Sequence, residues 1–401
     1  MNKTIINRNK YLKNIKNFIN KDIVKIILWQ RRVWKSYIMK QIINLLEKDY
    51  KIKKSQIIYI NKELYKWDNI KDYSDLYKKI KNYKYIFIDE IQDIKNWEKV
   101  IRSLQASGWH DIYIAWSNSN LLSGELSSFL SWRFVSFNIY PLDFKEFLQF
   151  HNLEKNKDNF YKYLNYWGLP YLINLELEDE VVNIYLKDVL NTIVLNDVIS
   201  RYNLRNIHFF KSLIKYLSRE IWSIFSAKSI SDYLKFQNQK ISNNIVLDYL
   251  SFSTQALFLN EVHRYDIIWK KIFEIKNKYF FTDIWIRNSL IWWFKQLDIA
   301  WILENIVYIN LVSNNWEVNV WEINWKEIDF VCKKNNKKIY VQVAYILDTR
   351  ETIKREFWVY DNVDDHWEKY VITLDEKAWW ASKNGIKYMS IIDFVYDLWN
   401  L

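Results

Sequence analysis

Short apolar runs of strand length recur in the first part of the chain, each followed by a polar turn. They lie within residues 25–43, 83–90 and 112–120, and the first leads through a basic turn into a helical pattern of apolar positions. Strands that alternate with helices in this way are typical of parallel sheets. We therefore predict an α/β fold with a parallel sheet for the N-terminal part.

The composition limits the class of protein. The 401 residues, 50% hydrophobic and 26% charged, suffice for two to three domains and exclude wholesale disorder. No uncharged apolar stretch reaches about 18 residues, and charges interrupt the N-terminal apolar pairs, so we expect a cytoplasmic protein with no membrane partner. The single cysteine, Cys332, and five scattered histidines argue against redox and zinc chemistry. A net charge of +11 favours polyanionic partners, although a lysine-rich surface explains it equally well.

The counts of glycine and tryptophan are unusual. The chain has 4 Gly and 22 Trp, whereas a usual glycine content of about 7% would give roughly 28 glycines. This suggests the hypothesis that most of these tryptophans stand where glycine belongs, as would happen if a UGA codon read as glycine had been translated as tryptophan. Proline is also scarce, at 2, which leaves open an independent loss of glycine.

The first strand-turn-helix segment tests this hypothesis. With glycine at Trp29 and Trp34, the turn reads G-Q-R-R-V-G-K-S, which matches the phosphate-binding loop G-x-x-x-x-G-K-S/T in its required context. Glycine allows the sharp exit from the strand and lets backbone amides close on the phosphates, whereas an indole at position 34 would occupy the space of the nucleotide. The residues expected to bind the nucleotide are Trp29, Gln30, Arg31, Arg32, Val33, Trp34, Lys35, Ser36 and Tyr37.

Other tryptophans fall where a turn, a loop or a hairpin favours glycine. These are Trp116, Trp132, Trp167, Trp292, Trp293, Trp316, Trp321, Trp325, Trp379 and Trp380. By contrast, Trp67 and Trp97 fit genuine aromatic anchors, and Trp367 and Trp399 are undecided. The alternative is a tryptophan-rich chain with an inactive nucleotide site.

The apolar strand within residues 83–90 ends in two acids, which is a Walker B pattern. We expect Lys35 to reach the β and γ phosphates of ATP, and the Ser36 hydroxyl and Asp89 to hold Mg²⁺. Glu90 would polarise the attacking water, so Glu90 and Lys35 are the predicted catalytic residues. A lone acidic pair after a strand often only caps a helix. Together with the phosphate-binding loop, however, the acidic pair is a strong indication of a nucleotide site.

The third apolar strand ends in small polar residues. Ser117 or Asn118 could sense the γ-phosphate there, and a helix N-cap role fits them equally well. Candidates for stabilising charge in the transition state are Arg31, Arg32, Arg133, Arg201 and Arg205, although a surface ion pair suits any single one better.

With glycines restored, the run from Ile86 to Phe147, including P-L-D-F-K-E-F, resembles prokaryotic AAA-type ATPases that carry a C-terminal domain of unknown function. Later segments that support the resemblance are S-A-K-S-I-S-D-Y-L, F-F-T-D-I-W-I-R-N, L-E-N-I-V-Y, K-E-I-D-F-V and R-E-F. The similarity covers nearly the whole chain and implies an ATP-binding AAA fold, a helical region, a winged-helix region and a restriction-endonuclease-like domain. The departures are Trp29 and Trp34, which put ATP binding in doubt if they are genuine.

The rest of the chain fits this organisation. We expect an AAA-type domain in residues 1–150, a helical lid in 151–205, a winged-helix region in 206–285 and the C-terminal domain in 286–401. The winged-helix pattern is a helix near 210–221, a segment that Ser226 would cap, a second helix and two alternating strands. That second helix is poor in Lys and Arg, which favours packing against neighbours over reading DNA.

The C-terminal stretch offers a second chemistry. A PD-(D/E)xK nuclease needs acids on two successive strands and a lysine, with a metal ion bound by the carboxylates. Glu304, Glu327 and Asp329 are the available acids, but Gln342 and Ala344 occupy the acid and lysine positions. We therefore expect a catalytically degenerate, nuclease-like shell that serves as a binding module.

The sequence predicts an ATP-hydrolysing molecular switch with ATP and Mg²⁺ as cofactors. The alternative is a nucleic-acid-binding regulator or degenerate nuclease, with nucleic acid bound through the winged-helix or C-terminal region. An inert scaffold is favoured if Trp34 is genuine. The pattern is compatible with oligomerisation and does not identify the partner coupled to hydrolysis.

Overall fold

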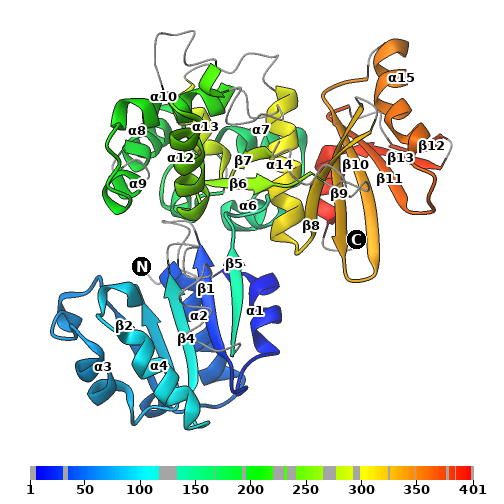
Figure 1. Cartoon of the computed structure of the whole chain (residues 1–401). Coiled ribbons are helices and arrows are strands. Elements are labelled where there is room, and N and C mark those ends of the chain that lie inside the picture. The colour runs from blue at the N-terminus through cyan, green and yellow to red at the C-terminus, as the bar shows by residue number, and fades with distance from the viewer. Residues whose placement is uncertain are drawn as a thin grey trace. The chain divides into compact units, whose positions relative to one another are not determined.

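In the computed structural model the chain folds into two compact units (Figure 1). Met1–Tyr140 with Gln255–Leu257 form the first, and Pro141–Thr254 with Phe258–Leu401 form the second. The structure describes residues 6–29, 35–116, 133–166, 168–191, 196–219, 230–232, 241–264, 277–291, 299–323, 326–347, 349–375, 379–383 and 385–398.

The first unit contains a five-stranded sheet in the order β2-β3-β4-β1-β5, and every pairing is parallel. The strands are β1 Val24–Trp29, β2 Ile57–Asn61, β3 Tyr85–Asp89, β4 Asp111–Trp116 and β5 Phe134–Ile139. The helices are α1 Asn9–Lys16, α2 Lys35–Lys48, α3 Tyr73–Ile80 and α4 Trp97–Ala106, with short 3₁₀ turns η1 Lys54–Gln56, η2 Tyr65–Trp67 and η3 Ile91–Asp93. The prediction of an α/β fold with a parallel sheet is confirmed.

Helices cover both faces of this sheet, which explains why its strands read as nearly continuous apolar runs. Ile86 and Ile88 of β3 join a cluster with α3 and α4, whereas Phe87 between them joins a cluster with α1 and α2. All three side chains are fully buried. The alternation along β3 fixes the register that brings Asp89 to the carboxyl edge of the sheet.

The second unit is mostly helical before its sheets begin. Its helices are α6 Phe144–His151, α7 Lys157–Tyr166, η5 Pro170–Asn174, α8 Asp179–Val189, α9 Asn196–Arg201, α10 Ile207–Arg219, α12 Asn243–Gln255, α13 Ile284–Leu290, α14 Ile299–Ser313, α15 Arg350–Trp358, η8 Val359–Asn362 and α16 Ile391–Asp397. The P-L-D-F-K-E-F tract starts α6 with a capping box, in which Asp143 accepts from the amide of Glu146 at 2.8 Å and the Glu146 side chain accepts from the amide of Asp143. This tract is therefore a helix start, with the apolar residues behind it buried.

The strands of the second unit form a two-stranded ribbon and a six-stranded sheet. The ribbon pairs β6 Leu259–Val262 with β7 Lys278–Phe281, antiparallel. The sheet has the order β12-β13-β11-β10-β9-β8, with β10, β11 and β13 parallel and the remaining pairs antiparallel. Its strands are β8 Glu317–Ile323, β9 Lys326–Lys334, β10 Lys337–Ala344, β11 Glu368–Thr373, β12 Trp379–Lys383 and β13 Ile386–Ser390. The predicted hairpin is formed by β8 and β9.

Within the described residues of the predicted winged-helix region, helices α10 and α12 precede strands β6 and β7, and residues 230–232 between the two helices are also helical. The expected helix near 210–221 corresponds to α10, and the second helix corresponds to α12. Ser226, the expected cap, lies outside the described residues.

The tryptophans differ in their surroundings. Trp97 is buried in the core of the first unit and Trp67 packs against the same cluster, as expected of aromatic anchors. Trp116, Trp316 and Trp321, which the turn argument assigned to glycine, also contact their neighbours. Trp379 and Trp380 lie in β12. Outside the described residues are Trp34, Trp132, Trp167, Trp292, Trp293, Trp325 and Trp399.

A strict requirement for glycine is visible at Gly168, next to position 167. A Cβ added to Gly168 would lie 2.5 Å from the carbonyl oxygen of Leu142 and 2.6 Å from its amide nitrogen. The amide of Leu142 donates to the carbonyl of Gly168 at 2.9 Å. The third atom that a Cβ would meet is Cβ of Pro141 at 2.9 Å. The two nearest atoms are backbone and the third belongs to a proline ring, so the turn cannot relax by moving a flexible side chain.

Candidate functional site

The predicted phosphate-binding loop has the expected strand-then-helix context. Trp29 is the last residue of β1 and Lys35 is the first residue of α2. The start of a helix presents free backbone amides and a positive dipole end, which suit a phosphate group. The predicted ligands Gln30, Arg31, Arg32, Val33, Trp34 and Ser117, with its alternative Asn118, lie outside the described residues.

Ser36 and Asp89, the two predicted metal ligands, lie together. The Ser36 hydroxyl donates to Oδ2 of Asp89 at 3.1 Å. Asp89 ends β3 and is fully buried, and its neighbours in register are Asn61 of β2 and Ala115 of β4. A hydroxyl and a carboxylate are oxygen donors of the kind that Mg²⁺ prefers, with other positions left to water and phosphate. The two residues therefore fit the predicted metal.

Tyr59 is a third member of this group that the sequence did not reveal. It lies in β2, and its hydroxyl donates to the same Oδ2 of Asp89 at 3.2 Å. Burial raises the pKa of Tyr59 above its ordinary value, and the Asp89 carboxylate adds to this effect. Tyr59 thus stays protonated and remains a donor. It sits in an apolar strand with no motif, so only strand alternation could have pointed to it.

Glu90, the predicted water-polarising residue, has a left-handed backbone with φ 55° and ψ 52°. It is buried, and Nε2 of Gln92 donates to its Oε2. A non-glycine residue in this conformation carries backbone strain, and such residues cluster at functional sites. Glu90 stands at the N-cap position of η3 but makes no side-chain cap hydrogen bond. The capping role that a D-E pair often has is therefore not seen here.

Tyr37, the last residue of the predicted loop set, holds the N-terminal segment against α2. Its hydroxyl donates to the carbonyl of Ile6 at 3.2 Å, and Nε2 of Gln41 donates to the same oxygen at 2.8 Å. Gln41 in turn accepts from the amide of Arg8 at 3.1 Å. The side chains of Tyr37 and Gln41 thus hold Ile6 and Arg8 beside α2.

The candidate arginines differ in position. The carbonyl of Arg133 accepts from the amide of Val24, which begins β1, and its guanidinium lies 3.8 Å from Asp22. Arg133 therefore lies at the amino edge of the parallel sheet, opposite the edge that carries Asp89. Arg201 ends α9 in the second unit.

A buried charge cluster occupies the second unit where the nuclease-like site was predicted. Nζ of Lys278, from β7, lies 2.7 Å from Glu304 of α14, 2.9 Å from Glu327 of β9 and 4.0 Å from Asp329. The lysine side chain is 1% exposed. Burial works to lower the pKa of Lys278, but the three carboxylates raise it above its ordinary value. The surrounding carboxylates therefore favour the charged form of Lys278.

Gln342 connects Asp329 of this cluster to Glu356 through its neutral amide group. Its Oε1 accepts from the amide of Asp329 at 3.3 Å, and its Nε2 donates to Oε2 of Glu356 at 3.0 Å. Oδ2 of Asp329 accepts from the amide of Val343 at 2.7 Å. A carboxylate at position 342 would face Glu356 directly, whereas an amide satisfies both partners.

The residues present do not fit a divalent metal in this cluster. Among the residues that the structure describes, no three His, Cys, Asp or Glu side chains are arranged to hold a metal ion. The ammonium of Lys278 takes the central position among the acids. Lys278 and Glu356 were not among the predicted site residues, because neither belongs to the strand motif that indicated this site.

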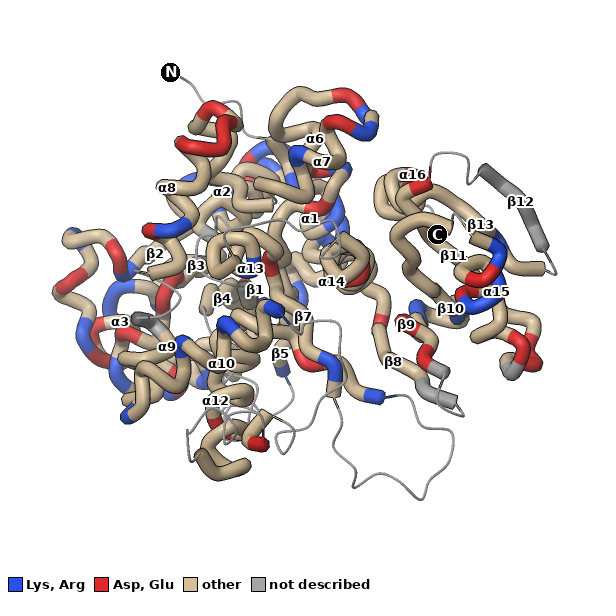
Figure 2. Tube along the Cα trace, turned by 90° about the horizontal axis from the view of Figure 1, so that it is seen from above, with Lys and Arg blue, Asp and Glu red and all other residues tan. Residues whose placement is uncertain are grey.

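The charges of the chain are interleaved. Figure 2 shows basic and acidic segments alternating along both units. No helix within the described ranges combines the length and the apolar character needed to cross a membrane.

Comparisons with known proteins cover most of the chain. A sequence family described as an AAA domain matches residues 21–148. An uncharacterized protein of Haemophilus influenzae is 33% identical over 413 residues, which cover 98% of this chain and 100% of the relative. The uncharacterized protein MJ1544 of Methanocaldococcus jannaschii is 32% identical over 416 residues, covering 93% of this chain and 88% of the relative. Among solved structures, the Walker-type ATPase PABY2304 of Pyrococcus abyssi shares 14% identity and a TM-score of 0.49, over 72% of this chain and 96% of that one.

Proposed function

The chain belongs to the family of these Haemophilus and Methanocaldococcus proteins and carries an AAA domain, and from that premise we propose that it binds and hydrolyses ATP as a molecular switch. The observation that carries the proposal is the hydrogen bond from Ser36 to Asp89, which joins the start of α2 to the end of β3. The two halves of a Walker site meet in this way. The family match supports the class of domain.

Each residue has a separate task in the proposed reaction. Lys35 neutralises charge on the β and γ phosphates, and Ser36 and Asp89 hold Mg²⁺ directly or through water. The metal ion would supply further neutralisation of the phosphate oxygens. Glu90 accepts a hydrogen bond from the attacking water and orients it. Gln92 fixes one oxygen of Glu90 and so limits the rotation of its carboxylate.

Glycine at positions 29 and 34 is part of the proposal. The supporting observations are the motif that glycine restores and the place of the two positions, at and just beyond the end of β1. The mass of a tryptic peptide spanning residues 33–35, from protein made in its own host, tests it directly. A peptide containing Val, Gly and Lys is expected, and one containing Val, Trp and Lys would overturn the hypothesis.

ATP turnover tests the enzymatic part. We expect turnover from protein carrying glycine at positions 29 and 34, and loss of turnover in the same protein with Lys35→Ala. Lys40→Ala, an exposed lysine on the same helix, is the matched control and should keep full activity. Equal turnover in the Lys35 variant and its parent would remove the proposal.

For the second unit we propose a winged-helix region at 206–285 followed by a restriction-endonuclease-like shell that binds rather than cleaves. The Lys278 cluster supports binding over cleavage, because a fixed ammonium occupies the centre of the acids. Duplex DNA incubated with Mg²⁺ or Mn²⁺ should therefore remain intact. Cleavage that Asp329→Asn abolishes would contradict the proposal. A helical lid at 151–205, a cytoplasmic location and oligomerisation belong to the same proposal.

A further inference from the structure

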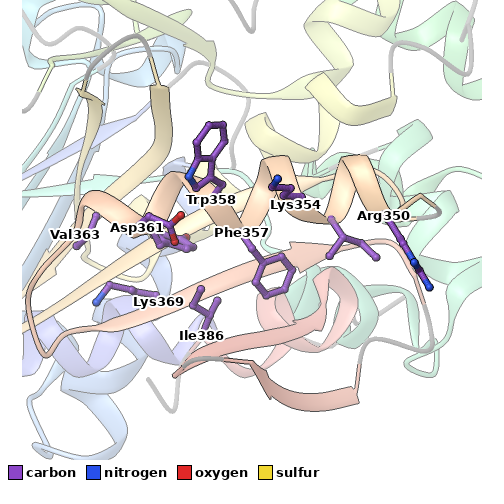
Figure 3. Close-up of a pocket in the computed structure, with 10 residues that line it drawn as sticks. Arg350, Lys354, Phe357, Trp358, Asp361, Val363, Lys369 and Ile386 are labelled. Carbon is purple, nitrogen blue, oxygen red and sulfur yellow. The ribbon is translucent and has the colours of Figure 1, made fainter.

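A cavity of about 620 Å³ lies beside α15 in the second unit (Figure 3). Residues from α15, η8, β11 and β13 line it. This volume falls within the range of about 300 to 1,000 Å³ that is usual for small-molecule pockets. It is larger than an inorganic anion needs. The cavity is separate from the acid cluster, because Glu356 of α15 turns toward Gln342 whereas its neighbour Phe357 lines the cavity.

The cavity carries an excess of positive charge. Arg350 and Lys354 are four residues apart on α15, so their side chains are neighbours on the helix surface. Both are exposed, and neither forms an ion pair with any residue that the structure describes. Lys369 adds a third cation, whose Nζ donates to the carbonyl of Asp365 at 2.7 Å and lies 3.6 Å from the carboxylate of the same residue. Asp361 is the single carboxylate among the lining residues. The cavity therefore favours an anion.

The rest of the lining is apolar and includes an aromatic ring. Phe357 is half-buried, and Figure 3 shows it on α15 near Ile386 of β13. Its ring centroid lies 6.1 Å from that of Tyr388, so the ring is supported from within the unit. A flat ring of a ligand could stack here. Trp358 also lines the cavity, but its indole is 51% exposed and we assign it no contact with the ligand.

We infer that this cavity binds a nucleotide unit, with its phosphate on Arg350 and Lys354 and its base against Phe357. Arginine binds phosphate through a planar pair of donors, and bases stack on aromatic side chains with little dependence on sequence. An acidic peptide would satisfy the cations but would leave the ring unused. The unit can come from a single-stranded nucleic acid or from a free nucleotide. The inference does not depend on ATP hydrolysis in the first unit.

The test uses the full chain and a fluorescent oligothymidylate of about 12 nucleotides without a terminal phosphate. A probe of this kind lacks the β and γ phosphates that the phosphate-binding loop recognises. Affinity is measured over a series of salt concentrations. The variants are Arg350→Glu with Lys354→Glu, and Phe357→Leu, which keeps apolar volume but removes the ring. Lys53→Glu with Lys54→Glu, two exposed lysines of the first unit, gives the same change of net charge as a control.

We expect the Arg350/Lys354 double variant to bind at least about tenfold more weakly, with the slope of log affinity against log salt reduced by about 1.4. Phe357→Leu should bind about fivefold more weakly with an unchanged slope. The Lys53/Lys54 control should bind like the parent. Competition by thymidine monophosphate would identify a free nucleotide as the source, and its failure would identify the strand.

Two outcomes would overturn the inference. One is equal binding by the parent and the Arg350/Lys354 variant. The other is a combination of two results: poly-glutamate displaces the probe as effectively as unlabelled oligothymidylate does, and Phe357→Leu leaves the affinity for the probe unchanged. Thermal unfolding of each variant shows whether it is folded. If the Arg350/Lys354 variant does not fold, the conservative Phe357→Leu change still tests the inference.

Discussion

Ser36 and Tyr59 donate hydrogen bonds to the same atom, Oδ2 of Asp89, at 3.1 and 3.2 Å. One comes from the start of α2 and the other from β2. The carboxylate is thereby oriented from two sides before any ligand arrives. If Asp89 binds Mg²⁺ as proposed, preorganisation of this kind would keep its carboxylate from rotating.

Tyr59→Phe should weaken the response to Mg²⁺ without stopping the reaction. The change removes one donor to Asp89 and keeps the ring, and a lost hydrogen bond of about 1 kcal/mol corresponds to roughly a fivefold rise in the Mg²⁺ concentration for half-maximal turnover. Turnover at saturating Mg²⁺ should stay within about twofold of the parent. Tyr65→Phe, at an exposed position, is the control. An unchanged Mg²⁺ dependence in Tyr59→Phe would show that the hydroxyl has no role in orienting Asp89.

Glu90→Gln should separate binding from hydrolysis. The amide keeps the size of the side chain but cannot polarise water as a carboxylate does, so turnover should fall by at least about 100-fold. Nucleotide affinity should change little. Gln92→Ala, which frees one oxygen of Glu90, should give an intermediate loss. Asp93→Asn, in the same turn, is the control. A loss of nucleotide binding in Glu90→Gln would argue for a structural role instead.

Lys278→Met should destabilise the second unit strongly. It removes the cation that Glu304 and Glu327 share and leaves these partly buried carboxylates, 14% and 32% exposed, without it. Breaking a buried ion pair from one side costs about 3–5 kcal/mol. Lys16→Met breaks an exposed pair with Asp49 and should cost less than about 1 kcal/mol. Urea unfolding measures both. Similar values for the two variants would show that the Lys278 cluster contributes little.

Asp283→Asn should reduce the dependence of stability on pH. Burial raises the pKa of Asp283 well above its ordinary value. The folded chain therefore holds this proton more tightly than the unfolded chain, so the stability it contributes is present at low pH and is lost as pH rises through the folded-state pKa. Asparagine keeps a cap acceptor for the amide of Trp285 but has no proton to lose.

We expect the unfolding free energy of Asp283→Asn to fall less than that of the parent between about pH 5 and pH 8. Asp72→Asn, at the less buried cap of α3, should follow the parent. Urea unfolding at the two pH values provides the measurement. The same pH dependence in Asp283→Asn and the parent would place the titrating group elsewhere.

Motifs made of neighbouring residues were predictable. Apolar runs with acids at their ends predicted the parallel sheet and the approach of Ser36 and Asp89, because the carboxyl ends of parallel strands share one edge. Tyr59, Gln92 and Lys278 could not be found in this way. Their partners are set by packing between elements, and nothing in the local pattern around Lys278 indicates that Glu304 and Glu327 will surround it. The hydrophobic periodicity of the sequence likewise could not predict the mixed parallel and antiparallel strand order of the second sheet.

The ion pairs of Lys278 also determine which C-terminal fragments of the chain we expect to fold. A fragment that begins at residue 286 would keep Glu304, Glu327 and Asp329 and lose the lysine that balances them. It would also lose His263, whose carbonyl accepts from the amide of Val320 at 3.1 Å next to β8. Expression of the C-terminal part alone should therefore start upstream of β6, and shorter versions should be recovered as insoluble material.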